Sequence, residues 1–176
     1  DKDTSRGLGD VYKRQEYNGR ARGGLCTQFM ADEINTSGAP IGVFMSPTKS
    51  FILPDDKDTD IIMVGPGTGI APFRAFMEQR VHDGGAGKNW LFFGDQSEKT
   101  EFYYKDEIES WIDEGHLWRF TTAWSRDQEE KIYVQHRLKE HGAEVWEWFE
   151  RGAYFYICGD KQYMACLLYT SPSPRD

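Results

Sequence analysis

The chain has 176 residues, of which 28% are charged and 39% hydrophobic, and its formal net charge is -8 with a pI near 5.0. This balance is typical of a folded globular protein, and the acidic charge argues against nucleic acid or an anionic membrane as the main partner. Because no apolar run could span a bilayer and no secretory signal pattern occurs, we expect a cytoplasmic protein without a membrane partner.

The two ends of the chain are related at the level of DNA. Codons GTG TAT AAG AGA CAG encode Val11–Gln15, and their reverse complement, read one base out of frame, encodes the C-L-L-Y-T of residues 166–170. The relation extends outward over the neighbouring residues on both sides. Opposite strands of one DNA segment have no reason to encode both ends of a protein. We therefore expect residues 1–15 and 166–176 to be translated adaptor, with native sequence continuing beyond both.

Residues 16–56 predict little regular structure. Gly23–Thr27 are expected to lead into a helix over Gln28–Ile34, and short strands are expected at Val43–Met45 and Phe51–Leu53. These elements are too few to close a core alone. We interpret this part as the C-terminal end of an antiparallel β-barrel domain that binds FAD, an assignment that rests on the family resemblance described below.

A polar connection beginning at Pro54 leads to the second part, residues 57–165. Apolar runs typical of buried parallel strands alternate here with helical patterns, which predicts a doubly wound α/β domain with a mostly parallel sheet. The expected strands are Ile61–Val64, Trp90–Gly94, Leu117–Trp124 and Tyr154–Cys158. The expected helices bury Phe73, Phe76 and Met77 after Pro72, then Ile108, Trp111 and Ile112, and continue at Val134–Leu138 and Ala143–Phe149.

Small or polar residues follow each expected strand, and the carboxyl ends of parallel strands form the edge where ligands bind. The most informative loop is Gly65-Pro66-Gly67-Thr68, whose glycines would let the backbone approach a ligand while the next helix directs its positive end at a phosphate. A plain tight turn before a helix is the alternative. The other strand ends are Gly94 with Asp95, Ser125 with Arg126, and Cys158 with Gly159 and Asp160.

The segment after the third strand combines cations, hydroxyl groups and an aromatic ring. It consists of Ser125 and Arg126, followed by Lys131, Ile132, Tyr133, Val134 and Gln135. Phosphate monoesters need fixed donors and positive charge, and an adenine ring accepts an aromatic or guanidinium face. The segment therefore suits the ribose 2′-phosphate that distinguishes NADP from NAD, with a solvated helix start as the alternative.

Cys158 and Asp160 are candidate catalytic residues because they lie together at a strand end, although buried cysteine is usually inert packing. The three cysteines and four histidines lack metal-ligand spacing, so no metal site is expected. Trp111, Trp146 and Trp148 occur at helical spacing and are expected to fill core or surface positions.

The second part resembles the ferredoxin–NADP reductase-type module of the diflavin reductases. The resemblance covers residues 60–164 and rests on I-I-M-V-G-P-G-T-G-I-A-P-F-R-A-F-M, W-L-F-F-G, A-W-S-R-D-Q-E-E-K-I-Y-V-Q and Y-I-C-G-D, in this order. Within that family, the stretches S-R-D-Q-E-E-K-I-Y-V-Q and G-A-E-V-W-E-W are most similar to the flavoprotein (alpha) subunits of NADPH sulfite reductases.

This resemblance implies that NADPH is bound, with its nicotinamide side at Gly65–Thr68 and its 2′-phosphate and adenosine at residues 125, 126 and 131–135. Cys158 would lie against the nicotinamide ring and assist hydride transfer to flavin. An earlier segment, Gly24-Leu25-Cys26-Thr27, is similar to the FAD pyrophosphate loop of the family.

By the same resemblance, the full-length protein is oligomeric and passes electrons from NADPH through FAD and FMN to a sulfite-reducing haemoprotein subunit. The family's upstream FAD-gripping segment, its flavin-covering aromatic residue and its FMN domain have no counterpart here. We therefore expect an incomplete FAD site and an inactive fragment. Two alternatives stay open: a reductase module for a cytochrome or other haem partner, and a non-catalytic dinucleotide-binding module.

Overall fold

The computed structural model describes residues 15–17, 19–22, 29–34, 38, 40–42, 44, 46–48 and 50–159 of the chain. Tertiary contacts divide the chain into two compact units, Asp1–Thr48 and Lys49–Asp176. This division falls before the polar connection at Pro54, because Phe51 and Leu53 pack against the core of the second unit.

The described residues of the first unit form a short antiparallel pair and one helical turn. Strand β1 (Gln15–Tyr17) pairs with β2 (Arg20–Arg22) around Gly19, whose φ of +69° suits glycine. The π-helical turn η1 (Phe29–Ile34) lies within the helix expected over Gln28–Ile34. Of the strand expected at Val43–Met45 only Phe44 is described, and it belongs to no regular element.

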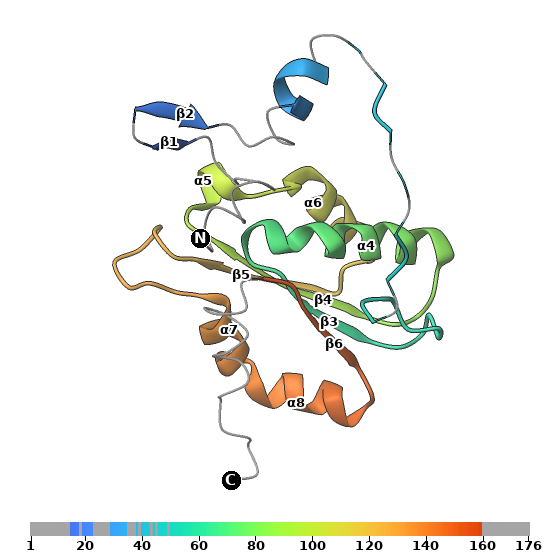
Figure 1. Cartoon of the computed structure of the whole chain (residues 1–176). Helices are drawn as coiled ribbons and strands as arrows, with labels where there is room; N and C mark the ends of the chain where they lie inside the picture. Colours follow the sequence, from blue (N-terminus) through green and yellow to red (C-terminus); the bar gives the residue numbers. More distant parts are fainter. Residues whose placement is uncertain are drawn as a thin grey trace. The chain divides into compact units, whose positions relative to one another are not determined.

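The second unit is built on a four-stranded parallel sheet (Figure 1). Its strands lie in the order β5-β4-β3-β6, and every neighbouring pair is parallel. Parallel neighbours require crossover connections, which the intervening helices provide. The predicted α/β fold with a parallel sheet is confirmed. The strand bounds are Ile61–Val64 for β3, Asn89–Asp95 for β4, Arg119–Trp124 for β5 and Tyr154–Ile157 for β6.

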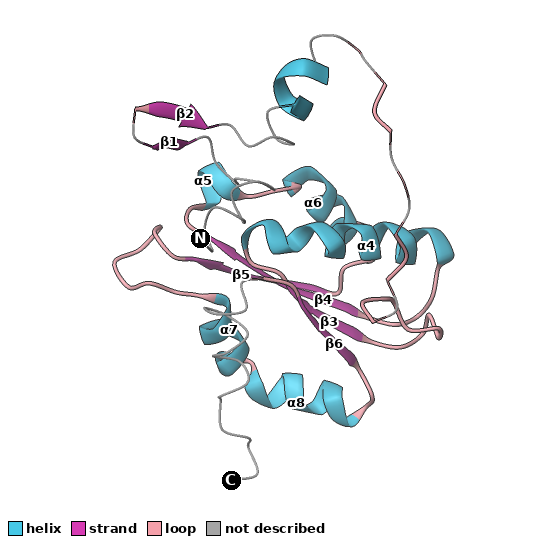
Figure 2. Ribbon diagram, in the orientation of Figure 1, coloured by secondary structure: helices cyan, strands magenta, loops and turns pink. Residues whose placement is uncertain are grey.

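Helices cover both faces of this sheet (Figure 2). Ile61 and Met63 of β3 belong to the core cluster on one face, together with Phe73 from α4, whereas Ile62 and Val64 belong to the cluster on the other face. Because both faces are covered, all four β3 residues are fully buried, which explains the continuous apolar run. The helices are α4 (Ala71–Asp83), α5 (Glu98–Glu101) and α6 (Lys105–Asp113) on the first face, and α7 (Val134–Glu140) and α8 (Gly142–Glu150) on the second.

Two local predictions were wrong. Phe51–Leu53 form no strand, since side-chain contacts hold them instead of a backbone ladder: Phe51 stacks on Phe76, and the Tyr156 hydroxyl donates to the Ile52 carbonyl at 2.8 Å. Ile112, expected on the buried face of its helix, is 42% exposed. It lies in the last turn of α6, where the Leu117 N–H bonds back to the Trp111 carbonyl and these two side chains fill the core instead.

Trp111 and Trp148 are buried in the two core clusters, as predicted from their helical spacing. Among the helices within the described residues, none has the length and apolar character that crossing a membrane requires.

Candidate functional site

The turn after β3 passes directly into a helix. The Gly65 N–H donates to the Phe92 carbonyl at 3.0 Å, which extends the sheet by one residue, and Gly67 then adopts a φ of +55°. A single 3₁₀ turn, η2 (Gly67–Ile70), leads into α4, with Pro72 in the first helical turn as predicted. Thr68 is exposed at the tip of this turn.

At two of the three positions in this turn only glycine fits, because a Cβ atom there would clash with other parts of the protein. A Cβ at Gly65 would lie 2.7 Å from a ring carbon of Phe73, and one at Gly69 would overlap the carbonyl oxygen of Cys158. Glycine is therefore required at both positions for packing against α4 and the end of β6, and the contact of this turn with a ligand stays a prediction. Gly67 differs, since its Cβ direction reaches only Asp95 Oδ2 at 3.5 Å.

The ends of β4 and β5 are joined by backbone hydrogen bonds. The Ser125 N–H donates to the Asp95 carbonyl at 2.9 Å, and the Arg126 N–H donates to the Gln96 carbonyl at 2.8 Å. Since Asp95 also lies beside Gly67, the turns after β3, β4 and β5 adjoin one another. The approach of Gly69 to Cys158 adds the end of β6. All four strand ends are thus connected at one edge, which we call the carboxyl edge.

Gly94 and Val134, both expected to bind cofactor, pack against each other. A Cβ at Gly94 would lie 2.9 Å from Val134 Cγ1 and equally close to the Ala123 carbonyl oxygen, so glycine here lets α7 close onto the sheet. Val134, the first residue of α7, is buried in the core cluster between α7 and the sheet, and Ile132 packs against this cluster. The structure gives these three residues a packing role, and their contact with cofactor stays a prediction.

The remaining expected residues at the start of α7 keep accessible surface. Lys131 is exposed, Tyr133 is 42% exposed and Gln135 is half-buried. The Tyr133 N–H donates to His136 Nδ1 at 3.1 Å, which fixes the start of α7. Figure 1 shows the loop from β5 to α7 leaving the sheet at the carboxyl edge.

Arg126 lines a shallow cleft at this edge together with two cations that sequence reasoning missed, Lys99 of α5 and Lys105 of α6. Lys131 is not among the residues of this cleft. Lys99 and Lys105 come soon after the end of β4, and that position is the signal that could have identified them. Lys99 and Lys105 therefore line the cleft with Arg126, together with the acidic residues Glu98 and Asp127, and the expected role of Lys131 stays a prediction.

A carboxylate beside Arg126 organises the cleft. Asp127 Oδ2 accepts the backbone N–H of Glu98 at 2.9 Å, at the start of α5. This hydrogen bond is the largest cause that holds the pKa of Asp127 below its usual value of 3.8, and a hydrogen bond with the Ser97 side chain is the second. The carboxylate is therefore occupied with the start of α5, and it links the β5 end to the segment that carries Lys99.

Cys158 follows β6, and its N–H donates to the Val64 carbonyl at 2.9 Å. The side chain is half-buried, and burial raises the pKa of its thiol above the usual 9.0, so the thiol is neutral near pH 7. Gly159 is exposed. Asp160 and the segment Gly24-Leu25-Cys26-Thr27 lie outside the described residues, and their proposed roles stay predictions.

Comparisons with known proteins agree with this geometry. Residues 63–168 match the family described as oxidoreductase NAD-binding domain. The chain is 51% identical over 152 residues to the sulfite reductase [NADPH] flavoprotein alpha-component of Klebsiella pneumoniae subsp. pneumoniae and to that of Salmonella typhi, and 49% identical to that of Serratia proteamaculans. Each alignment covers 86% of this chain but 25% of the relative, so the chain spans a quarter of the relatives' length.

Proposed function

Because the chain belongs to the oxidoreductase NAD-binding domain family, we propose that it is the NADPH-binding module of a sulfite-reducing flavoprotein reductase. In this proposal the full-length protein passes electrons through FAD and FMN to a haemoprotein subunit that reduces sulfite. The names of the relatives and the family resemblance support that wider scheme. The carboxyl edge supports the binding step, which is the part that this chain can perform.

The observation that carries the proposal is the connection of all four strand ends at the carboxyl edge. Gly67 lies beside Asp95, the Asp95 carbonyl accepts the Ser125 N–H at 2.9 Å, and Gly69 lies against Cys158. Dinucleotides bind outside this edge in open parallel sheets. The 13-residue helix α4 begins here and directs partial positive charge toward a pyrophosphate.

The 2′-phosphate end of NADPH fits the β5 side of this edge. Arg126 is exposed there with Lys99 and Lys105 in the same cleft, and the hydroxyl of Ser125 adds a donor. A phosphate monoester carries nearly two negative charges and accepts several hydrogen bonds, which this group of cations matches. NADH lacks the group, so these residues favour NADPH.

The nicotinamide end then lies on the β3 and β6 side. Bound NADPH supplies a hydride, which the flavin of the full-length protein accepts. Cys158 contributes a thiol that burial keeps protonated, so it can contact the ring without placing a negative charge beside it. Thr68 is the exposed side chain of the adjoining turn and is available to orient the carboxamide.

Replacing Arg126 by alanine tests the assignment. We expect NADPH to bind more weakly by about 1.5–3 kcal/mol, roughly tenfold to a hundredfold in Kd, because a charge-assisted hydrogen bond is lost. NADH binding should be unchanged, so most of the preference disappears. Isothermal titration calorimetry with NADPH and with NADH measures the two affinities.

Arg151→Ala is the matched control, since Arg151 is an exposed arginine next to β6 that pairs with Asp60 at the opposite end of the strands, at 3.7 Å. It should leave both affinities as they are. Equal loss of NADPH and NADH affinity in Arg126→Ala, or no loss, would refute the 2′-phosphate role.

A further inference from the structure

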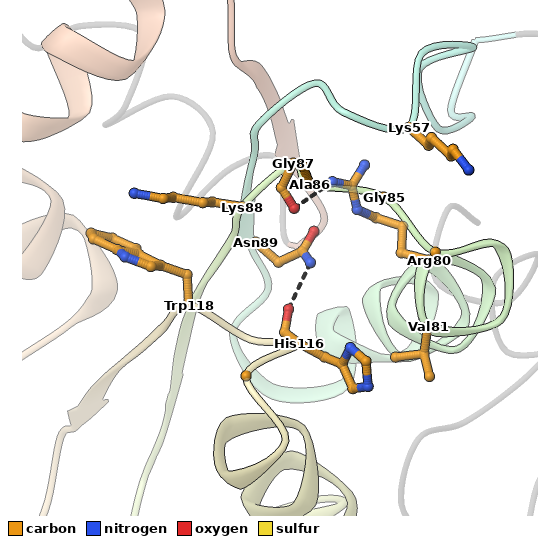
Figure 3. Close-up of a pocket in the computed structure, with 12 residues that line it drawn as sticks. Lys57, Arg80, Val81, Gly85, Ala86, Gly87, Lys88, Asn89, His116 and Trp118 are labelled. Carbon is orange, nitrogen blue, oxygen red and sulfur yellow. Dashed lines mark hydrogen bonds between the residues drawn. The ribbon is translucent and has the colours of Figure 1, made fainter.

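A second pocket, which we call the basal pocket, lies at the opposite edge of the sheet, where α4 ends and β4 begins (Figure 3). Its volume is about 300 Å³, within the range of small-ligand sites. Its lining includes Lys57, Arg80, Lys88 and His116, but no aspartate or glutamate. In a chain with a net charge of -8, Lys57, Arg80 and Lys88 give this lining a positive charge.

The side-chain oxygen of Asn89 is a buried hydrogen-bond acceptor in this pocket. The side chain is 5% exposed, and its Nδ2 donates to the His116 carbonyl at 2.7 Å. Its Oδ1 has no hydrogen-bond partner within the described part of the chain. Figure 3 shows Asn89 between Arg80 on one side and Lys88 with Trp118 on the other. Since a buried polar atom without a partner is costly, Oδ1 calls for an N–H or O–H group in this space.

Arg80 supplies a cation whose charge is only partly compensated. Its Nη2 donates to the carbonyls of Thr59 and Gly87 at 3.0 and 2.9 Å, and no carboxylate of the described residues lies within ion-pair distance of it. Burial lowers the pKa of Arg80 even though the charges of Asp60, Asp58 and Asp56 raise it. An anion in the pocket would offset this cost.

The neighbouring carboxylates hold the walls of the pocket. Asp58 Oδ1 accepts the Ala86 N–H at 2.7 Å, and Asp60 Oδ1 accepts the Lys88 N–H at 2.8 Å. Lys57 Nζ approaches the Asp83 carbonyl at the end of α4, at 3.5 Å, which reduces the negative end of the helix dipole. The carboxylates therefore bond to the backbone of the 84–88 loop, while the cations line the space.

We propose that the basal pocket binds a small oxyanion that carries its own O–H group, with hydrogen phosphate as the simplest member of this class. The anionic oxygens accept hydrogen bonds from Arg80 and from the lysines that line the pocket, and the O–H donates to Asn89 Oδ1. Sulfate has similar size and charge but no O–H at neutral pH, so it would place an acceptor against Oδ1. The pocket should therefore discriminate phosphate from sulfate. A phosphate ester with hydroxyl groups offers the same chemistry.

The test titrates the full 176-residue chain with inorganic phosphate, glycerol 3-phosphate and sulfate at matched ionic strength. We expect phosphate to bind at least about tenfold more tightly than sulfate, since an unpaired buried acceptor costs that much. The double variant Lys57→Gln, Lys88→Gln should weaken phosphate binding by about tenfold. Its urea midpoint should fall only slightly, because both side chains are exposed and lose only surface contacts with the Asp83 carbonyl and the Trp118 ring.

Arg126→Ala separates this site from the dinucleotide site. Phosphate binding that persists in Arg126→Ala and weakens in the lysine double variant supports the basal pocket. Binding lost only in Arg126→Ala overturns it and leaves the NADPH proposal intact. Equal binding of phosphate and sulfate shows that Asn89 selects nothing and also overturns it. Tighter binding of glycerol 3-phosphate than of phosphate identifies the ester as the ligand. Failure of both phosphates to bind means that water satisfies Asn89, and the proposal is then rejected.

Discussion

The two edges of one parallel sheet are held together in different ways. At the carboxyl edge, backbone groups bond to each other, as Ser125 does to Asp95 and Arg126 to Gln96, and the Asp127 carboxylate adds a side-chain link to the start of α5. The cations at this edge are exposed. At the opposite edge, side chains hold the backbone: Asp58 accepts an N–H of the 84–88 loop, and Arg80 donates to two carbonyls. The exposed cations of the first edge can therefore change with little effect on folding, whereas Asp58 and Arg80 at the second edge are part of the fold.

Gly69→Ala should produce the largest effect. The added Cβ would overlap the Cys158 carbonyl oxygen, which is backbone and cannot move without displacing β6 from β3. We expect a loss of about 3 kcal/mol in the free energy of unfolding, measured by urea denaturation, with weaker dinucleotide binding.

Gly142→Ala is the control, because a Cβ there meets no atom within 4 Å and the residue is already helical. Its effect should stay within about 1 kcal/mol. Similar stability of the two variants would show that the turn after β3 can separate from β6, and that the four strand ends are not tightly connected.

The sequence was sufficient to predict the sheet and the positions of its loops, because Ile61–Val64 and Trp90–Phe93 are apolar on both faces and each run ends in small or polar residues. Such local patterns follow from burial alone. Phe51–Leu53 also appear strand-like, but Phe51 packs on ring partners far along the chain, including Tyr156, which no local pattern reveals.

Other features of the edges depend on contacts between distant segments. Lys99 could not be assigned to the cleft of Arg126 without knowing that Asp127 bonds to the start of α5. The basal pocket likewise requires residues 57–60 to lie against the 84–88 loop, a contact that only the tertiary structure supplies. A glycine in the sequence indicates that the backbone approaches another group closely, but the sequence does not say whether that group belongs to a ligand or to the protein.

Arg80→Met should have an intermediate effect that is confined to the second edge. Two backbone carbonyls, of Thr59 and Gly87, lose their donor, and we expect about 2 kcal/mol of destabilisation by urea denaturation. NADPH affinity should not change, because the dinucleotide site lies at the other edge.

Arg74→Met, on the same helix, is the comparison. Arg74 pairs with Glu107 at 2.6 Å, but both side chains are more than a third exposed, so its loss should destabilise the protein clearly less than Arg80→Met does. If Arg80→Met is as mild as Arg74→Met, the side-chain connections at the second edge are not structural. A fall in NADPH affinity in Arg80→Met would show that the two edges are coupled.

The smallest expected effect concerns the pKa of Asp127, whose carboxylate links two turns of the carboxyl edge through a single hydrogen bond. Backbone and side-chain donors hold this pKa below 3.8, so the carboxylate stabilises the folded state above that pH, and the contribution is lost as pH falls through the lowered folded-state pKa. Glu98 is the first residue of α5 and follows an extended Ser97 (φ -141°, ψ 139°), a position that accepts proline.

Glu98→Pro therefore removes the N–H donor and keeps the helix start, whereas Glu98→Ala removes the same charge and keeps the donor. In a carboxyl NMR titration, Glu98→Pro should raise the pKa of Asp127 toward 3.8 relative to Glu98→Ala, because the backbone donor is the largest cause of the lowered value. The pKa of Asp83 should be the same in both variants, since the side chains of Gln79 and His82 lower it at the other end of the sheet. Identical Asp127 values in the proline and alanine variants would mean that the Glu98 N–H does not hold this carboxylate, and Asp127 would then not link the end of β5 to the start of α5.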